Sequence, residues 1–525
     1  MAISSKKLSL IISIIVLAVM IITFSCYILF NNTTGDLYGG YTNFSDFIEG
    51  TLWAYATIES GQILSDTFFY PYAIPFGANL LFAPFVRFFG IGLLANRLGM
   101  LLFFVILCFT LYYFSAAVDT DGWKKYSIMT LLLMSFSTQL AFNLLLHILY
   151  YSLGFVCMIG MLASIIWLKR SGNKKKHYIT LLLFSLWGAA NGLPSAALSV
   201  FPVLLALILS RGNIRRDHAL QIVATSLVCG LLLYKLTMKG IHETDYLSRV
   251  GTYQLQSIST WFIHIKSLPE TWFSLFISCN PKGVSIFQGT GIFVFLEIIF
   301  SLVITAAPLP YIVKYKRLNF NEIAVFHSAV FVWIVCLVQY VFLRSGGSKE
   351  LYRLLFNCVL VNAMLAAVWY PHLQINWDKQ KEVTIHAVAE VTAACMCAFV
   401  VLHNTGPVES ALAKELQNRG FSHGYTTYWQ ANETTVLTNG QVQCCCVQVN
   451  ERGLIPNFYN IDSSWYQYQE GDFFVALPEN TLNILQENED YWNRFFQNGA
   501  KDLFFADGCA VYVFDEHYWG ILLAQ

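Results

Sequence analysis

The chain has 525 residues, of which 56% are hydrophobic and only 12% are charged, and its mean hydropathy is +0.53. Soluble domains carry about 25% charged residues, so this composition excludes an ordinary soluble protein. Thirty-two basic residues balance thirty-two acidic residues, which argues against a nucleic-acid partner that needs a basic face.

The first long apolar segment comprises residues 8–30, and it is long enough to cross a hydrocarbon layer of about 30 Å. A cleavable signal peptide has a shorter apolar core and small residues at its cleavage site, so we expect a retained first helix. Ten more apolar segments follow, at roughly 92–117, 127–146, 149–168, 178–191, 195–210, 218–237, 291–312, 321–343, 354–370 and 384–402. The sequence therefore predicts an α-helical polytopic membrane protein with about eleven transmembrane helices.

Short basic groups between these segments indicate the orientation, because cytoplasmic loops carry the excess of Lys and Arg. The groups are Lys6 and Lys7, Lys124 and Lys125, Lys169 to Lys176, Arg211 to Arg216, Lys314 to Arg317, and Lys379 with Lys381. Placing all of them inside predicts a multi-pass protein of the cell (plasma or inner) membrane with a cytoplasmic N-terminus. The segments 31–91, 238–290, 344–353 and 403–525 then face outward.

The outer loop 31–91 combines aromatic and acidic residues, a mixture that suits short helices at the membrane interface. Asp46 and Glu49 are three residues apart, so a helix places both carboxyl groups on one face. Such a pair beside an apolar surface can have one raised pKa and act as a general base. The alternative is a solvated interfacial helix with ordinary acidic residues.

The outward link 344–353 carries Lys349 and Arg353, although positive charge on the outer side runs against the topology rule. Arg presents a planar fork that matches phosphate geometry, and Lys adds a point charge. An anionic headgroup held here is one interpretation. An interfacial salt bridge, for example between Glu350 and Arg353, is the other.

Further polar residues lie in two other outward stretches. His147 and Tyr151 occupy the turn between the third and fourth apolar segments, where a His can bond a ligand but is more often an ordinary interfacial residue. Asp245 belongs to a polar cluster in the loop 238–290, which resembles a segment that covers a substrate. No Walker loop, dinucleotide fingerprint, HExxH or GxSxG pattern occurs in the chain.

The C-terminal residues 403–525 read as a small soluble α/β domain. We expect a helix over 408–420, strands near 424–429, 434–437, 441–449, 502–506 and 510–514, and a helix near 480–498. Asn439-Gly440 predicts a hairpin turn between two of these strands. Cys444, Cys445 and Cys446 match no zinc pattern; one bridge to Cys509 and a buried strand without a bridge both remain open.

Taken together, these features resemble the GT-C superfamily of integral membrane glycosyltransferases of bacterial type. Members have a first span, a long outer loop with an early acidic residue, and a Pro- and Phe-rich stretch before the second span. Here Asp46 and Glu49 are followed by the run from Phe68 to Gly77. The run Ser348 to Arg353 is similar to an element in which Lys, Glu and Arg follow a His, with Ser348 in place of that His.

The resemblance covers 1–402 in layout, as a transmembrane catalytic module, and 403–525 is consistent with the extracytoplasmic domain that many members carry. It implies an inverting hexosyltransferase that moves a sugar from a polyprenyl-phosphate donor to an acceptor hydroxyl, for example in cell-envelope polysaccharide synthesis. The implied base is Asp46, with Glu49 beside it. The implied phosphate-binding residues are Lys349, Arg353, Arg97 and Arg87, and the implied contacts to acceptor or sugar are His147, Tyr151 and Asp245.

The resemblance also implies the partners: the lipid-linked sugar, the bilayer, and an acceptor glycan, lipid or protein. Some members bind a divalent metal at the first-loop acid, but too few ligands stand here to predict a cofactor. A flippase for a lipid-linked saccharide is the alternative function. It is disfavoured because transporters place polar residues near the midplane, and here only Glu297 and Glu390 stand out within the apolar segments.

Overall fold

The structure is a computed structural model that describes residues 5–30, 44–119, 122–146, 149–170, 174–210, 218–243, 254–277, 285, 287–343, 351–372, 379–403 and 410–523. Their internal contacts separate the chain into two units. The first unit comprises 1–40, 101–236 and 247–406, and the second unit comprises 41–100, 237–246 and 407–525. The predicted division into 1–402 and 403–525 stays a prediction. The second unit groups most of the outer loop with the C-terminal residues.

The first unit is helical, and the protein is a polytopic membrane protein. Its helices are α1 (Ser5–Phe30), most of α4 (Leu93–Val118), α5 (Lys124–Met134), α6 (Gln139–Leu146), α7 (Leu149–Arg170), α8 (Lys174–Ala190), α9 (Gly192–Leu198), α10 (Val200–Leu209), α11 (His218–Thr237), α13 (Ile258–Ser274), α14 (Gly289–Ala306), α15 (Leu309–Val313), η2 (Tyr315–Arg317), α16 (Phe320–Val338), η3 (Gln339–Leu343), α17 (Tyr352–Trp369), η4 (Tyr370–His372) and α18 (Lys379–His403).

All eleven predicted apolar segments are helical in the part of the chain that the structure describes. By length and composition, seven helices can cross a membrane there, or eight if the bent pair α9 and α10 counts as one span. The other three predicted spans are also helical: 127–146 is divided between α5 and α6, 178–191 lies in α8, and 384–402 lies in α18. The polytopic membrane fold is confirmed, and the count of about eleven spans stays a prediction.

Two of the predicted spans are interrupted for identifiable reasons. The segment 127–146 breaks between α5 and α6, where the Thr138 hydroxyl accepts the Ala141 N–H and donates to the Leu275 carbonyl. Such side-chain bonds to the backbone compete with a continuing helix. The pair α9 and α10 bends by 42° at Ser199. Pro202 has no N–H for the carbonyl of Leu198, which permits the bend.

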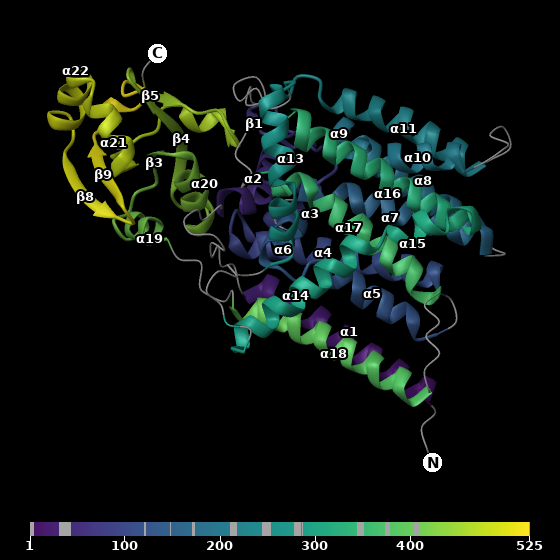
Figure 1. The fold of residues 1–525 in the computed structure, drawn as a ribbon. Helices are drawn as coiled ribbons and strands as arrows, with labels where there is room; N and C mark the ends of the chain where they lie inside the picture. The colour runs from purple at the N-terminus through teal and green to yellow at the C-terminus, as the bar shows by residue number, and fades with distance from the viewer. Residues whose placement is uncertain are drawn as a thin grey trace. The chain divides into compact units, whose positions relative to one another are not determined.

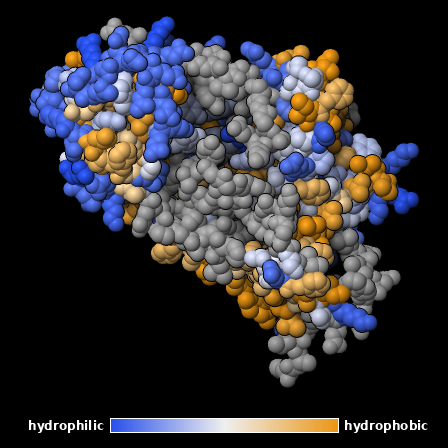
Figure 2. Space-filling view, turned by 60° about the vertical axis from the view of Figure 1, so that its left-hand side comes forward, coloured by the Kyte–Doolittle hydropathy of each residue, from blue (hydrophilic) through white to orange (hydrophobic). Residues whose placement is uncertain are grey.

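Helices α7 and α17 are the most enclosed of the long helices, and each packs against α16 and against the other. The outer helices instead expose large apolar side chains, such as Ile15 and Ile22 on α1 and Val388 on α18. Figure 2 shows orange side chains gathered at the lower end of the view, where α1 and α18 lie. Helices that contact the lipid of a bilayer need apolar side chains on their outer face, and this arrangement around the enclosed pair α7 and α17 provides them.

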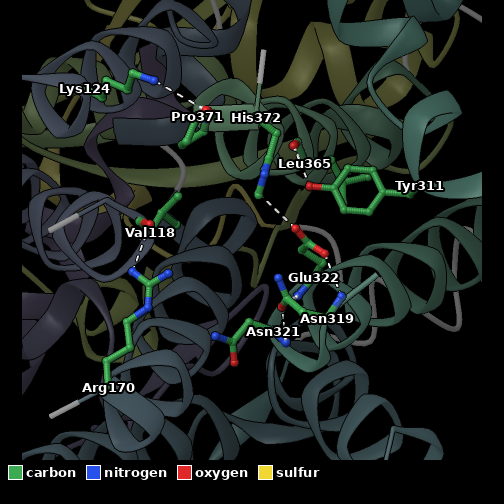
Figure 3. A network of polar contacts seen from close by, with 10 residues as sticks. All are labelled: Val118, Lys124, Arg170, Tyr311, Asn319, Asn321, Glu322, Leu365, Pro371 and His372. Carbon is green, nitrogen blue, oxygen red and sulfur yellow. Dashed lines mark hydrogen bonds and ion pairs between the residues drawn. The ribbon is translucent and has the colours of Figure 1, made fainter. Parts of the chain in front are cut away.

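The ends of several helices in the first unit are joined by polar contacts (Figure 3). Side-chain donors bond to backbone carbonyl groups there, in the pairs Lys124–Pro371 (3.4 Å), Arg170–Val118 (3.0 Å) and Tyr311–Leu365 (2.9 Å). These donors satisfy carbonyl groups at or near helix C-termini, which have no partner within the helix.

Helix α16 begins in the same network. Asn319 and Glu322 form a capping box at its N-terminus, and Glu322 also pairs with His372 at 2.9 Å. Lys169 lies over the ring of Phe320, next to this cap. The basic residues 124–125, 169–170 and 314–317 thus lie at one end of the unit, as the orientation rule requires. Which side of the membrane that end faces stays a prediction.

A buried polar cluster joins α1, α5 and α18. The Ser13 hydroxyl lies 3.0 Å from both His386 Nε2 and Glu390 Oε1, and 3.4 Å from the hydroxyl of Ser127. Helices α1 and α18 run side by side (Figure 1). Since polar groups inside an apolar helix pair need partners, this cluster specifies the register in which the two helices pack.

Ser13→Ala is expected to lower the stability of the membrane part by about 1 kcal/mol, because it removes bonds between helices. The measurement is the midpoint of thermal unfolding in detergent micelles. Ser185→Ala is the matched control, since the Ser185 hydroxyl is equally buried but bonds only to carbonyl groups of its own helix. Equal shifts for both variants would contradict a role in helix pairing.

The second unit contains two groups of elements. From the outer loop 31–91 come α2 (Phe44–Ser60), β1 (Phe68–Tyr70) and α3 (Ala78–Phe89); the start of α4 follows them, and β2 (His242–Glu243) comes from the loop 238–290. The C-terminal elements are α19 (Ala411–Asn418), β3 (His423–Thr426), α20 (Tyr428–Leu437), β4 (Gln443–Asn450), β5 (Gly453–Pro456), β6 (Ile461–Asp462), η5 (Ser463–Tyr466), β7 (Phe473–Pro478), α21 (Glu479–Gln486), α22 (Glu489–Tyr491), η6 (Trp492–Gln497), β8 (Asp502–Ala506), β9 (Cys509–Phe514) and η7 (Glu516–Tyr518).

Six C-terminal strands form one sheet in the order β5-β4-β3-β7-β9-β8, with β3 parallel to both β4 and β7 (Figure 1). Parallel strands need a crossover, and α20 supplies it between β3 and β4. The small α/β domain is confirmed, but the strand expected at 434–437 is wrong because these residues end α20. Packing against α2 and β4 overrides the β-branched character of the run.

The expected hairpin turn at Asn439-Gly440 is also wrong. Asn439 (φ 53°) and Gly440 (φ 76°) end α20, and the Gly440 N–H donates to the Thr435 carbonyl at 2.8 Å. A helix C-terminus of this kind and a tight hairpin both need left-handed residues, so this pair of residue types favours the two equally.

The cysteines of the C-terminal sheet are buried and unbridged. Cys444, Cys445 and Cys446 lie on β4, and Cys509 lies on β9. Two strands, β3 and β7, separate β4 from β9, and neighbouring strands are about 4.8 Å apart. The distance is therefore too great for a disulfide, whose Cα atoms lie within about 7 Å.

Candidate functional site

Helix α2 carries the two predicted catalytic carboxyl groups. Asp46 lies in its first turn, where the partial positive charge of a helix N-terminus favours an anion. Glu49 is buried, at 4% exposure, and so are Ile48, Leu52 and Trp53. The predicted helix is confirmed. Glu49 lies in its buried apolar face, and Asp46 lies at the edge of that face.

The two carboxyl groups have different environments. Burial, and then the nearby charge of Asp46, raise the pKa of Glu49 well above its usual range. Burial therefore favours the protonated form of Glu49. A buried acid next to a half-buried carboxylate is an arrangement in which the less buried member of the pair carries the charge and can accept a proton.

A tyrosine of the C-terminal sheet region completes this pair. The Tyr428 hydroxyl donates a hydrogen bond to Asp46 Oδ1 at 2.8 Å. Burial and the charge of Asp46 raise the pKa of Tyr428 well above its usual range, so the phenol keeps its proton and acts as the donor. The ring of Tyr459 packs edge-on against that of Tyr428, with centroids 4.7 Å apart.

Helix α2 is held in place by bonds from two directions. The Asn96 side chain on α4 donates to the Phe47 carbonyl at 3.3 Å and accepts from the Thr51 hydroxyl at 2.9 Å. On another side, the Trp53 indole donates to Asn460 Oδ1 at 2.6 Å. These bonds fix where Asp46 and Glu49 lie.

The raised pKa of Glu49 predicts how the stability of the folded protein depends on pH. Below the ordinary carboxyl pKa of 4.5, Glu49 is protonated in both the folded and the unfolded chain. As the pH rises above that value, only the unfolded chain ionises, so folding loses stability until the raised pKa is reached. Glu49→Gln removes this loss.

We therefore expect Glu49→Gln to melt higher than the wild type at pH 8 and to differ little at pH 4.5. Thermal unfolding in detergent across this range measures the difference. Glu59→Gln on the same helix is the control, since Glu59 is exposed. A Glu49→Gln difference that is constant with pH would argue against a neutral Glu49.

The predicted phosphate-binding arginines have different surroundings. Arg97 lies on α4 next to Asn96; it is partly buried, and its Nε has no hydrogen-bond partner in the part of the chain that the structure describes. Arg87 is exposed in the last turn of α3. Arg353, in the first unit, lies in the first turn of α17 and hydrogen-bonds to Tyr151 of α7.

Arg353 and Tyr151 were predicted separately, and the structure brings them together. The ring of Tyr150 lies 4.5 Å from that of Tyr151, and both phenols face the guanidinium group. Phenol oxygens that orient an arginine fork leave its charge intact, which suits an anion-binding site. The remaining predicted residues, Lys349, His147 and Asp245, lie outside the described residues.

Hard cations prefer ionised oxygen ligands, and burial disfavours the ionised form of Glu49. Among the residues that the structure describes, no three His, Cys, Asp or Glu side chains are grouped so that they could hold a metal ion.

The sequence did not indicate Tyr428, Tyr459 or Asn460 as functional residues. Tyr428 stands in the stretch 424–429, which was predicted only as a strand and suggested no role. Its bonding partner Asp46 is 382 positions away along the chain, and no local pattern encodes that contact.

Comparison with known proteins gives no matching family model and no matching curated protein. Among solved structures, the chain is similar to apo ArnT from Cupriavidus metallidurans, with a TM-score of 0.55, 9% identity and 98% of each chain covered. ArnT bound to undecaprenyl phosphate matches with a TM-score of 0.46 and 11% identity, over 95% of this chain and 97% of that one. The oligosaccharyltransferase AglB from Archaeoglobus fulgidus, in complex with an inhibitory peptide and a dolichol-phosphate, gives 0.47 and 11%, over 89% and 69%.

The match to apo ArnT spans both units almost from end to end. At 9% identity such a match speaks for the fold, and the fold is the one that the layout of the sequence predicts. The chain therefore shares the overall fold of apo ArnT.

Proposed function

We propose that the chain is an inverting glycosyltransferase that moves a sugar from a polyprenyl-phosphate donor to an acceptor hydroxyl at the outer face of the cell membrane. The observation that carries the proposal is the pair on α2, in which Glu49 is buried while Asp46 accepts a hydrogen bond from a phenol. The fold shared with apo ArnT and the resemblance of the sequence layout to the GT-C superfamily support the same class of reaction.

In the proposed reaction, Asp46 is the general base. It takes the proton of the acceptor hydroxyl as the oxygen forms a bond to the anomeric carbon of the sugar. The bond from that carbon to the phosphate oxygen breaks in the same step, and the electron pair leaves with the polyprenyl phosphate. A single in-line displacement inverts the anomeric carbon, and the phosphate needs no general acid because it is already a stable anion.

The leaving phosphate needs cations that stabilise its developing charge. Arg97, with an Nε that lacks a partner among the described residues, and Arg353, oriented by Tyr151, are the proposed contributors. Arg87 and Lys349 are further candidates, and His147, Tyr151 and Asp245 are proposed to contact sugar or acceptor. The acceptor is a hydroxyl of a glycan, lipid or protein.

The test is to incubate the purified protein in liposomes with a radiolabelled polyprenyl-phosphate hexose and a mixture of candidate acceptors. Covalent transfer of the label to an acceptor, with release of polyprenyl phosphate, supports the enzyme. Movement of the intact donor between leaflets without any transfer would instead support a flippase and reject the proposal.

A further inference from the structure

The C-terminal residues of the second unit are joined to the outer-loop residues by backbone pairing. Strand β6 pairs antiparallel with β1, with Phe69 opposite Ile461. The Asn460 N–H donates to the Phe69 carbonyl at 2.9 Å, and the ring of Phe458 stacks on that of Phe69 at 4.8 Å. Backbone pairing of this kind is a fixed connection within the unit.

Asn460 makes this connection at a special backbone position. It has a left-handed conformation, with φ 57°, which Asn tolerates better than most residues. Its side chain is fully buried and accepts the bond from Trp53 of α2. The neighbouring residue Tyr459 then packs against Tyr428, so the bonds at β1 and α2 also support the tyrosine that reaches Asp46.

Tyr428 itself is placed by secondary structure. It is the first residue of α20, the crossover helix of the C-terminal sheet, and α20 packs directly on α2. Its hydroxyl can reach Asp46 Oδ1 because both helices begin near the same point. The position of Asp46 therefore depends on residues from two distant parts of the chain.

We propose that Tyr428 is a positioning residue for Asp46: its hydroxyl fixes the carboxylate and keeps the negative charge of the pair on Asp46. The C-terminal residues thereby supply part of the catalytic site and are more than an appended domain. This inference rests on the proposed function, in which Asp46 is the base.

The physical reason is that a hydrogen bond donated to a carboxylate stabilises its ionised form. Glu49 cannot take the charge without ionising in a buried site. With the phenol in place, Asp46 holds the charge at the pH of the reaction. Without it, protonation of Asp46 becomes easier.

The experiment compares Tyr428→Phe with Tyr425→Phe in the full-length protein in detergent. Tyr425 is a matched control because its buried hydroxyl bonds to the Gly520 N–H in the same C-terminal sheet region, away from α2. Carbodiimide labelling of Asp46, followed by mass spectrometry from pH 3 to 9, gives the pH midpoint of its ionisation. This readout needs no enzymatic activity.

Tyr428→Phe is expected to move the labelling midpoint of Asp46 to higher pH by about one unit, since one charge-assisted hydrogen bond is lost. The acidic limb of the pH–rate profile for sugar transfer should move with it, and kcat should fall about tenfold with little change in KM for the donor. Replacement of Tyr428 by 3-fluorotyrosine, a more acidic phenol of the same shape, should move the midpoint in the opposite direction.

If the labelling midpoint of Asp46 in both Tyr428→Phe and the fluorotyrosine variant equals that of the wild type, the proposal is wrong. So would an equal shift in Tyr425→Phe, which would indicate a general effect of removing a phenol. A wild-type protein that transfers no sugar but shows the expected labelling shifts would reject the proposed function and leave the Tyr428–Asp46 coupling established.

Discussion

Asp46→Asn is expected to reduce sugar transfer by about 10²- to 10⁴-fold, the usual contribution of a general base. Asn has nearly the shape of Asp and can still accept the hydrogen bond from Tyr428, but it cannot take a proton from the acceptor hydroxyl. Glu49 is a poor replacement, because that carboxyl group is buried and its burial favours the protonated form. The loss should appear in kcat.

The measurement is single-turnover transfer from a labelled polyprenyl-phosphate hexose, with donor binding followed separately. Donor binding should stay within about threefold of the wild type, because the phosphate contacts are unchanged. Asp66→Asn is the control: it makes the same chemical change at an exposed position of the same outer loop. Full activity in Asp46→Asn would show that Asp46 is not the general base.

Arg353→Ala is expected to weaken use of the donor by about 10- to 100-fold in kcat/KM, the worth of one hydrogen bond between charged groups. The guanidinium lies against the phenols of Tyr150 and Tyr151, and in the proposed reaction it stabilises the departing phosphate. Arg353→Lys keeps the charge but loses the planar fork, so it should recover only part of the activity.

The effect of Arg353 is separated from a loss of folding by two comparisons. Arg494→Ala removes an exposed cation from the C-terminal residues and should leave transfer unchanged. Inorganic phosphate or free polyprenyl phosphate should inhibit the wild type more strongly than Arg353→Ala. If the variant responds to donor and inhibitor as the wild type does, the phosphate site lies elsewhere, with Arg97 as the next residue to test.

The buried cluster of Ser13, His386 and Glu390 has no part in the proposed reaction. The sequence marked Glu390 as an exceptional acidic residue within an apolar segment, and the structure gives it partners on α1 and α18. Buried ionisable groups between helices can determine which helices pair and in which register. A structural role of this kind explains why an acidic residue in an apolar helix does not by itself indicate transport.

Helix boundaries in the first unit follow from local properties of the sequence. An apolar run of about twenty residues satisfies its own backbone hydrogen bonds as a helix in a membrane, whatever its neighbours are. This is why all eleven predicted segments are helical in the described residues. The breaks at Thr138 and before Pro202 interrupt two of these segments. The mean hydropathy of a segment does not predict such breaks, because each depends on a single capping hydroxyl or a single missing backbone N–H.

The C-terminal residues show the opposite case. The strands near 502–506 and 510–514 were predicted correctly, because both are short runs rich in aromatic, Val and Leu residues, whereas 434–437 and Asn439-Gly440 were not. A β-branched run and a pair of left-handed residues are each compatible with two structures. Packing of α20 on α2 and β4 decides between them, and that packing involves residues far apart in the sequence.

The sequence by itself determined that the chain crosses a membrane many times, that basic groups lie between the spans, and that Asp46 and Glu49 share one face of a helix. These features depend on composition and on spacings of a few residues. Only the tertiary structure decided that Glu49 is the buried member of the pair, that Arg353 meets Tyr151, and that Tyr428 bonds to Asp46. Burial and hydrogen bonding depend on which distant segments pack together, and a pattern within one segment carries no record of its partner.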